Sequence, residues 1–106
     1  MCGICGIVDL TSAGRADESL VRAMSARIRH RGPDGDGFYT APGRAAVLGM
    51  RRLSIIDVDG SDQPLYNEDQ SLAMVFNGEI YNYKELQADL RRRGHTLRTE
   101  GDGETI

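Results

Sequence analysis

The stretch Gly-Ile-Cys-Gly-Ile-Val-Asp at residues 3–9 is a short apolar run close to the N-terminus. Its length and the aspartate that closes it predict a β-strand, since a helix needs a longer apolar pattern. A continuous apolar run of this kind is typical of a strand that is buried on both faces. The fold is therefore expected to begin with a buried strand at the first residues of the chain.

Two helices are predicted downstream of this strand. Residues 17–30 begin with an acidic turn, and their apolar side chains recur every four residues at Leu20, Met24 and Ile28. Residues 82–93 begin with Asn82 and Glu85 in the spacing of a capping box. Gly94 follows a run of arginines, which is typical of a helix C-terminus.

Further strands are predicted between and after the helices. Residues 37–40 and 44–50 flank Ala41-Pro42-Gly43, which predicts a hairpin. Other short apolar runs predict strands at 53–58, 71–76 and 95–98. Asp102 is expected to be the N-cap of a third helix, and such a helix needs several residues beyond Ile106. The chain is therefore expected to be the front part of a larger domain.

Composition excludes some classes of partner. The 106 residues include 13 basic and 16 acidic side chains, a net charge of −3, so no strong basic field is available for nucleic acid or an anionic membrane. No apolar run approaches the roughly 18 residues of a membrane span. The N-terminus also lacks the basic segment of a signal peptide. A cytoplasmic protein is expected, with no nucleic-acid or membrane partner.

The two cysteines are spaced as Cys-x-x-Cys at Cys2 and Cys5. This spacing suits a redox pair or half of a zinc site. Zinc is not favoured, because His30 and His95 stand alone in the sequence. A redox motif normally opens a helix after a strand, whereas this one lies inside an apolar run. The ordinary interpretation of such a cysteine is a small buried apolar residue.

The position of Cys2 suggests a different chemistry. If Met1 is removed, Cys2 carries both a thiol and a free α-amine, and the amine can take the proton of the thiol. One residue would then supply both nucleophile and base.

Two loops have competing interpretations. The acidic segment 57–62 has Gly60 at its fourth position, whereas a calcium-binding EF-hand loop has glycine at its sixth, so a solvated loop is expected and no metal site is predicted. Asn77-Gly78 is ordinarily a type I′ hairpin turn.

Several motifs nevertheless occur together in one order: M-C-G-I-C-G-I-V at 1–8, H-R-G-P-D-G at 30–35, R-L-S-I-I-D at 52–57, Q-P-L at 63–65, F-N-G-E-I-Y-N at 76–82 and D-G-E at 102–104. Together they resemble the glutaminase domain of glutamine-dependent asparagine synthetases. These domains are class II glutamine amidotransferases, which are N-terminal-nucleophile hydrolases. The resemblance covers essentially all of this chain but only about the first half of that domain.

The resemblance implies a role for each matching residue. Cys2 is the expected nucleophile, and Asn77 with the backbone N–H of Gly78 is the expected oxyanion hole. Arg52 is expected to bind the substrate α-carboxylate. The remaining substrate contacts implied are the backbone of Leu53, Ser54, Ile55 and Ile56 and the carboxylates of Glu79 and Asp102, which would hold the α-ammonium.

The resemblance also implies a fold and a context. The expected fold is α+β, the front half of a four-layer αββα sandwich, with residues 1–106 as a partial amidotransferase domain. The expected function is hydrolysis of glutamine to glutamate and ammonia, with no cofactor in this part. A C-terminal synthetase domain using ATP and Mg²⁺ would take the ammonia to amidate aspartate, and a homodimer is left open. Two alternatives to this function are left open. The chain could belong to another class II amidotransferase with a different acceptor, or it could be a non-catalytic binding or redox fragment.

Overall fold

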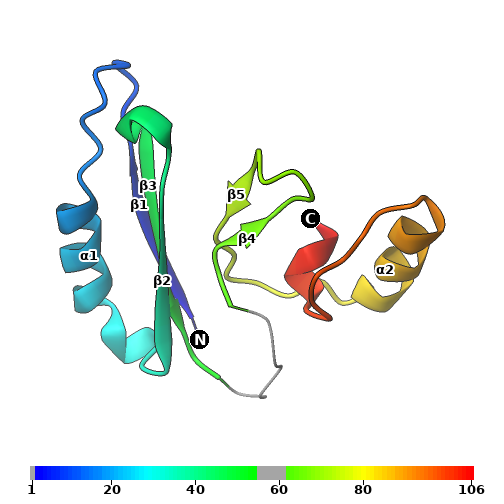
Figure 1. Ribbon diagram of the computed structural model, residues 1–106. Coiled ribbons are helices and arrows are strands. Elements are labelled where there is room, and N and C mark those ends of the chain that lie inside the picture. Colours follow the sequence, from blue (N-terminus) through cyan, green and yellow to red (C-terminus); the bar gives the residue numbers. More distant parts are fainter. Residues whose placement is uncertain (1, 55–61) are drawn as a thin grey trace.

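A computed structural model describes residues 2–54 and 62–106 of the chain. The elements lie in a flat, elongated body of 41 × 31 × 18 Å (Figure 1). In chain order the strands and α-helices are β1 (Gly3–Val8), α1 (Glu18–Arg27), β2 (Gly35–Thr40), β3 (Ala46–Arg52), β4 (Leu65–Tyr66), β5 (Ala73–Met74) and α2 (Tyr83–Arg92). Short 3₁₀ helices occupy Arg29–Arg31, Pro42–Arg44 and Asp102–Thr105. This mixture of helices and antiparallel strands is an α+β fold, as predicted.

The N-terminal half is a three-stranded antiparallel sheet in the order β1-β3-β2. The predicted first strand and the predicted hairpin are both confirmed, although β2 begins two residues early, at Gly35. β1 pairs with β3 so that Gly3 lies opposite Arg51. This register brings the N-terminus beside the end of β3, which positions the site described below.

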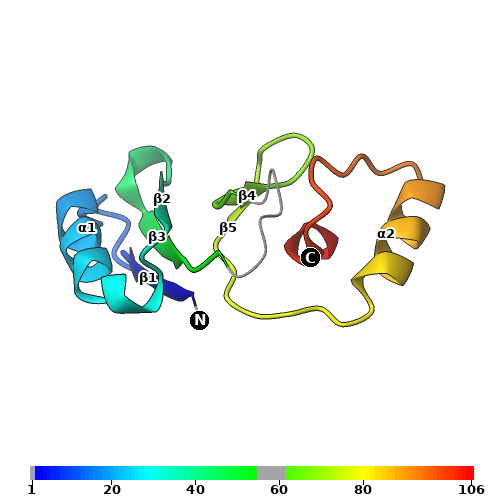
Figure 2. The ribbon, with the colours of Figure 1, turned by 90° about the horizontal axis from the view of Figure 1, so that it is seen from below.

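Helix α1 covers one face of this sheet (Figures 1 and 2). The core between them consists of the fully buried Ala16, Val21 and Val47, with Cys5, Ile7, Met24 and Phe38 packed around them. Alternate residues of β1 point to the other face, where Ile4 is 50% and Val8 61% exposed. The expectation that β1 is buried on both faces is therefore wrong for the described residues, because they provide a covering helix on one side only.

Helix α1 begins one residue after its cap. The carboxylate of Asp17 accepts a hydrogen bond from the backbone N–H of Ser19 at 2.8 Å. The buried face of the helix contains Val21 and Ser25, whereas Leu20 is 51% exposed. The predicted apolar face is therefore wrong at Leu20, whose place in the core is taken by Val21 beside Val47, whereas Met24 packs against the core as predicted.

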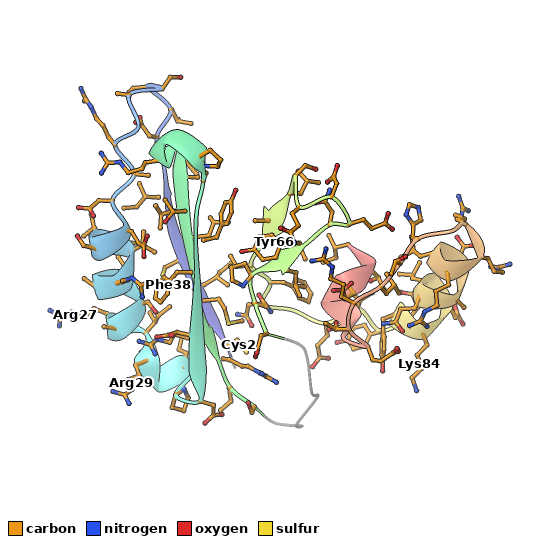
Figure 3. All side chains as sticks on the ribbon, in the orientation of Figure 1. Cys2, Arg27, Arg29, Phe38, Tyr66 and Lys84 are labelled. Atoms are coloured by element: carbon orange, nitrogen blue, oxygen red, sulfur yellow. The ribbon has the colours of Figure 1, made fainter. Side chains whose placement is uncertain are left out.

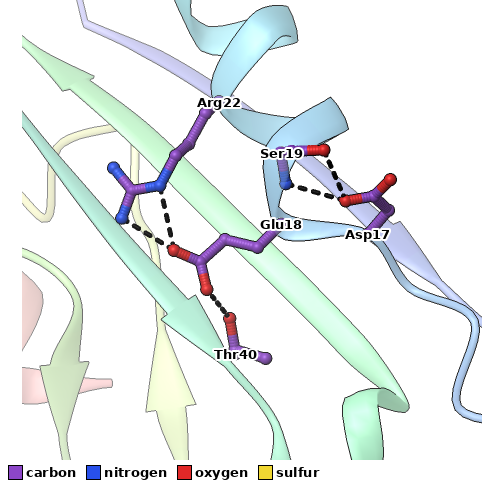
Figure 4. A network of polar contacts seen from close by, with 5 residues as sticks. All are labelled: Asp17, Glu18, Ser19, Arg22 and Thr40. Atoms are coloured by element: carbon purple, nitrogen blue, oxygen red, sulfur yellow. Dashed lines mark hydrogen bonds and ion pairs between the residues drawn. The ribbon is translucent and has the colours of Figure 1, made fainter.

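A carboxylate ties α1 to the sheet (Figure 4). The hydroxyl of Thr40 on β2 donates to Glu18 Oε2 at 2.7 Å, and Arg22 donates to Oε1 at 2.7 and 2.9 Å. The Thr40 hydrogen bond, followed by the one from Arg22, lowers the pKa of Glu18 below its usual value. These contacts favour the ionised form, so their contribution to stability is present at neutral pH and is lost as the pH falls through the lowered folded pKa.

We therefore expect Glu18→Gln to lower the thermal unfolding midpoint at neutral pH. The difference from the unsubstituted protein should shrink as the pH falls through the lowered pKa of Glu18, because the carboxylate of the unsubstituted protein then becomes protonated. Circular dichroism melts across pH measure this. Glu85→Gln is the matched control, because Glu85 makes no hydrogen bond to the described residues. A difference in unfolding midpoint that stays constant down to the lowest pH contradicts the role of the Glu18 charge.

The C-terminal half differs more from the prediction. The expected strand 71–76 is reduced to β5, a two-residue strand paired with β4. Residues 95–98 form no strand, and Leu53 and Ser54 lie beyond the end of β3. The rest of the predicted strand 53–58 lies outside the described residues. These segments were predicted from apolar content, but a strand also needs a partner at hydrogen-bonding distance.

Helix α2 is confirmed, with small differences at its ends. Asn82 is its N-cap but makes no side-chain capping bond, so the capping box is not formed. Gly94 adopts a φ of 92° after the last turn, as expected for a helix C-terminus. Gly101, and not Asp102, is the N-cap of the final 3₁₀ helix.

The two halves meet along the second face of the sheet near β2. The rings of Tyr39 and Tyr66 contact edge to face, with centroids 6.1 Å apart. A side chain at Gly37 would overlap the backbone oxygen of Gln63, so glycine allows the chain before β4 to lie directly on β2. β4 and β5 thus lie between the sheet and α2 (Figure 2).

Candidate active site

A cleft of about 880 Å³ lies where the two halves meet. Every predicted site residue within the described part of the chain lines it: Cys2, Arg52, Leu53, Ser54, Asn77, Gly78, Glu79 and Asp102. Ile55 and Ile56, also predicted, lie outside the described residues. Residues up to 100 positions apart in the chain therefore contribute to one concave surface, which is where ligand sites are usually found.

Cys2 immediately precedes β1 and lies near the lower end of the sheet in Figure 3. Its Sγ is half-buried and accepts a hydrogen bond from the backbone N–H of Leu53 at 3.4 Å. Its carbonyl oxygen accepts from Arg31 Nε at 3.3 Å and from Asn77 Nδ2 at 3.1 Å. These contacts hold the backbone of Cys2 on two sides while the thiol faces the cleft.

Asn77 and Gly78 connect β5 to α2. Neither residue has a positive φ, so the pair is not a type I′ turn, and the hairpin interpretation is wrong. One N–H of the Asn77 amide binds Cys2, which leaves its second N–H available within the described part of the chain. The backbone N–H of Gly78 likewise makes no hydrogen bond to a described residue. Two available donors therefore line the same cleft as Cys2, and one of them belongs to an amide that binds the Cys2 carbonyl. A side-chain amide and a backbone N–H are the kinds of donor that form an oxyanion hole.

Arg52 is the last residue of β3, and its side chain is 23% exposed. Its NH1 binds the exposed carboxylate of Asp62 at 2.9 Å. The guanidinium is thus placed to bind a carboxylate within the cleft. A planar fork of donors can hold a substrate carboxylate through two parallel hydrogen bonds.

The acidic side of the cleft is formed by Glu79 and Asp102. Asp102 Oδ2 accepts a hydrogen bond from the backbone N–H of Ile80 at 2.8 Å, which fixes this carboxylate beside the chain that follows Glu79. The side-chain amide of Gln87 donates to the carbonyl of Gly101 at 3.2 Å and holds the adjacent backbone. Opposite charges therefore lie on the walls of one cleft, an arrangement suited to a zwitterionic amino acid.

Three supporting residues were not predicted. Arg31 binds the carbonyl of Cys2, and Asp34 Oδ2 accepts from the backbone N–H of Ser54 at 2.7 Å. Gln63 binds the backbone of Phe76, next to Asn77. Arg31 and Asp34 both lie in the H-R-G-P-D-G motif, and Gln63 lies in Q-P-L. The motifs were thus the signal that could have identified them, but local sequence does not show which backbone groups they reach.

The two cysteines have different surroundings. Cys5 Sγ lies 3.8 Å from the carbonyl of Val21 on the α1 side of the sheet, and burial raises its pKa. Both thiols are free, so they form no disulfide. No group of three or more potential metal ligands occurs among residues 2–54 and 62–106. None of the helices in this part of the chain has the length and apolar character needed to cross a bilayer.

Sequence comparisons agree with this geometry. The chain is 44% identical over 108 residues to asparagine synthetase [glutamine-hydrolyzing] 1 of Bacillus subtilis and 42% identical over 106 residues to asparagine synthetase [glutamine-hydrolyzing] 2 of Oryza sativa. It is 39% identical over 107 residues to a probable asparagine synthetase of Dictyostelium discoideum. Each comparison covers 100% of this chain, which spans 17%, 17% and 19% of the three relatives.

The match to a family model is equally complete, since the model of the glutamine amidotransferase domain aligns with residues 1–106. Together with relatives that align over the whole length of this sequence, the match shows that the chain belongs to the glutamine amidotransferase domain family.

Proposed function

We propose that this chain hydrolyses the side-chain amide of glutamine, with Cys2 as the nucleophile. The observation that carries the proposal is that the Cys2 thiol, the donors of Asn77 and Gly78, and charged groups of both signs line one cleft. Glutamine needs each of these partners, because it has an amide to be attacked, a carboxylate and an ammonium group.

The reaction begins at the N-terminus of the mature protein. With Met1 removed, the α-amine of Cys2 takes the thiol proton, and the sulfur attacks the amide carbon. The carbonyl oxygen becomes an oxyanion that receives hydrogen bonds from Asn77 Nδ2 and the Gly78 N–H. The ammonium form of the α-amine returns a proton to the departing nitrogen, so ammonia leaves and a thioester forms. Water then attacks the thioester, which releases glutamate and restores the thiol.

Substrate orientation follows from the charged walls of the cleft. Arg52 binds the α-carboxylate, replacing or sharing the contact that it makes with Asp62. Asp102 and Glu79 bind the α-ammonium. Asp102 suits this role because Ile80 occupies only one of its oxygens, so the second can accept from a ligand. Backbone of residues 53–56 lines the wall beside Arg52.

The proposal extends to the rest of the domain. The outer face of the sheet exposes Ile4 and Val8, and residues of this kind normally pack against another layer. We place a second sheet there, which gives the four-layer αββα sandwich of which residues 1–106 form the front half.

The relatives indicate the wider context. They are named glutamine-hydrolysing asparagine synthetases and are much longer than this chain. We propose that ammonia made here passes to a C-terminal synthetase domain that uses ATP and Mg²⁺ to convert aspartate to asparagine in the cytoplasm. This part of the protein would need no cofactor of its own.

The mature N-terminus tests the mechanism. Because nucleophile and base share one residue, mass spectrometry of the natural full-length protein should find Cys2, not Met1, as the first residue. Glutaminase activity is measured on the same sample. Activity in a preparation that quantitatively retains Met1 would overturn the mechanism, since the amine would then be part of a peptide bond and unable to take a proton.

A further inference from the structure

We propose that Gln63 is a positioning residue for the oxyanion hole. This inference rests on the proposed glutaminase function and assigns a role to the Q-P-L motif, which the reaction itself does not use. Gln63 lines the cleft but belongs to the chain before β4, whereas the oxyanion donors follow β5. Its effect on the reaction would pass through the backbone of Phe76.

The contact between Gln63 and Phe76 uses both ends of one amide. Gln63 Oε1 accepts a hydrogen bond from the backbone N–H of Phe76 at 2.6 Å, and Gln63 Nε2 donates to the backbone oxygen of Phe76 at 2.9 Å. Strand β5 ends at Met74, so Phe76 lies beyond the pairing of β4 with β5. The Gln63 amide therefore supplies the two backbone hydrogen bonds that Phe76 would otherwise make with a neighbouring strand.

The anchor itself is held on the rigid sheet. The backbone oxygen of Gln63 contacts β2 at Gly37, where a side chain would overlap it. On the far side of the contact, the ring of Phe76 packs against Gly78, since a Cβ there would lie 3.0 Å from two ring atoms. The sheet, Gln63, Phe76 and Gly78 thus form a continuous series of close contacts.

This series of contacts sets the direction of the two proposed oxyanion donors, the Asn77 amide and the Gly78 N–H. Asn77 follows Phe76 directly, so the backbone geometry of Phe76 sets the position of the Asn77 amide, which lies 3.1 Å from the Cys2 carbonyl, and of the Gly78 N–H. Oxyanion donors act only when they are already aimed at the charge that develops in the transition state. Loss of the Gln63 contact should therefore slow the chemical step while leaving ground-state binding of glutamine largely unchanged.

A second glutamine provides a matched contrast. Gln87, on α2, is 3% exposed and donates its side-chain amide to the carbonyl of Gly101, next to Asp102. It supports the proposed ammonium site and not the oxyanion hole. The same substitution at Gln87 should therefore raise KM for glutamine, because ammonium binding stabilises substrate and transition state alike.

The experiment is steady-state glutaminase kinetics on the full-length protein. Gln63→Met keeps the length of the side chain but loses the amide, and it should lower kcat by about tenfold or more with KM changed less than about threefold. Gln87→Met should instead raise KM for glutamine and leave kcat largely unchanged. A wild-type kcat in Gln63→Met, a loss confined to KM, or the same kcat loss in Gln87→Met each overturns the positioning role.

Gln63→Glu gives a second readout within one folded variant. Its ionised carboxylate accepts from the Phe76 N–H but turns a second oxygen toward the Phe76 carbonyl, whereas the protonated acid can again accept and donate. Its kcat relative to the unsubstituted protein should therefore rise as the pH falls from about 8 toward about 4.5, where a glutamate side chain becomes protonated. A ratio that does not change with pH overturns the proposal.

The proposed function has a separate control. If the unsubstituted protein lacks glutaminase activity, or if Cys2→Ala retains it, the glutaminase proposal fails. If both behave as proposed and Gln63→Met has a normal kcat, only the role of Gln63 fails.

Discussion

Cys2→Ala is expected to abolish glutamine hydrolysis by the full-length protein, with a loss of at least about four orders of magnitude. The substitution removes the sulfur that would form the thioester, and no other thiol lines the cleft among the described residues. If the full-length protein makes asparagine as proposed, its synthesis from added ammonia should persist, because it bypasses the amide-hydrolysis step. Glutaminase and ammonia-dependent assays on the same preparation measure the two activities.

Cys5→Ser is the control for this experiment. Cys5 Sγ lies beside the Val21 carbonyl on the α1 side of the sheet, away from the cleft. Its replacement should leave glutaminase activity within about an order of magnitude, as expected for a substitution outside the reacting groups. A redox pair would need both sulfurs. Equal losses in the two variants would therefore favour the redox interpretation over the nucleophile.

Asn77→Ala is expected to lower kcat for glutamine hydrolysis by about 10²–10³, with a small change in KM. The Asn77 amide is a donor next to Cys2, 3.1 Å from its carbonyl oxygen, and the charge that it would stabilise appears only after the sulfur has attacked. An interaction made only in the transition state affects kcat and kcat/KM together. Steady-state kinetics resolve the two constants.

Arg52→Ala is the complementary variant. A guanidinium that binds the α-carboxylate does so in the ground state as well as in the transition state, so its loss should mainly raise KM. The expected cost is that of a charge-assisted contact, about 1.5–3 kcal/mol, or roughly 10- to 150-fold. If Asn77→Ala changes only KM, the oxyanion assignment is wrong.

Local sequence was enough to predict the N-terminal half of the fold and helix α2 in the C-terminal half. The apolar run that became β1, the hairpin of β2 and β3, and both α-helices are defined by residue periodicity and by turn or cap residues within a few positions. These signals depend on the backbone preferences of neighbouring residues, so they can be read without knowing what packs against them. The motifs likewise identified residues that line one cleft in the folded chain.

Tertiary structure decided what local sequence could not. The predicted strand 71–76 was reduced to the two residues of β5, because a strand persists only where a partner lies alongside it. Val21 replaced Leu20 in the core because of what α1 packs against. The pairing of Gly3 with Arg51 brings Cys2 to Leu53 across about fifty residues of chain. The bond from Gln63 to the backbone of Phe76 has no local signature either, because any exposed peptide group can accept an amide partner and only the folded chain selects which one does.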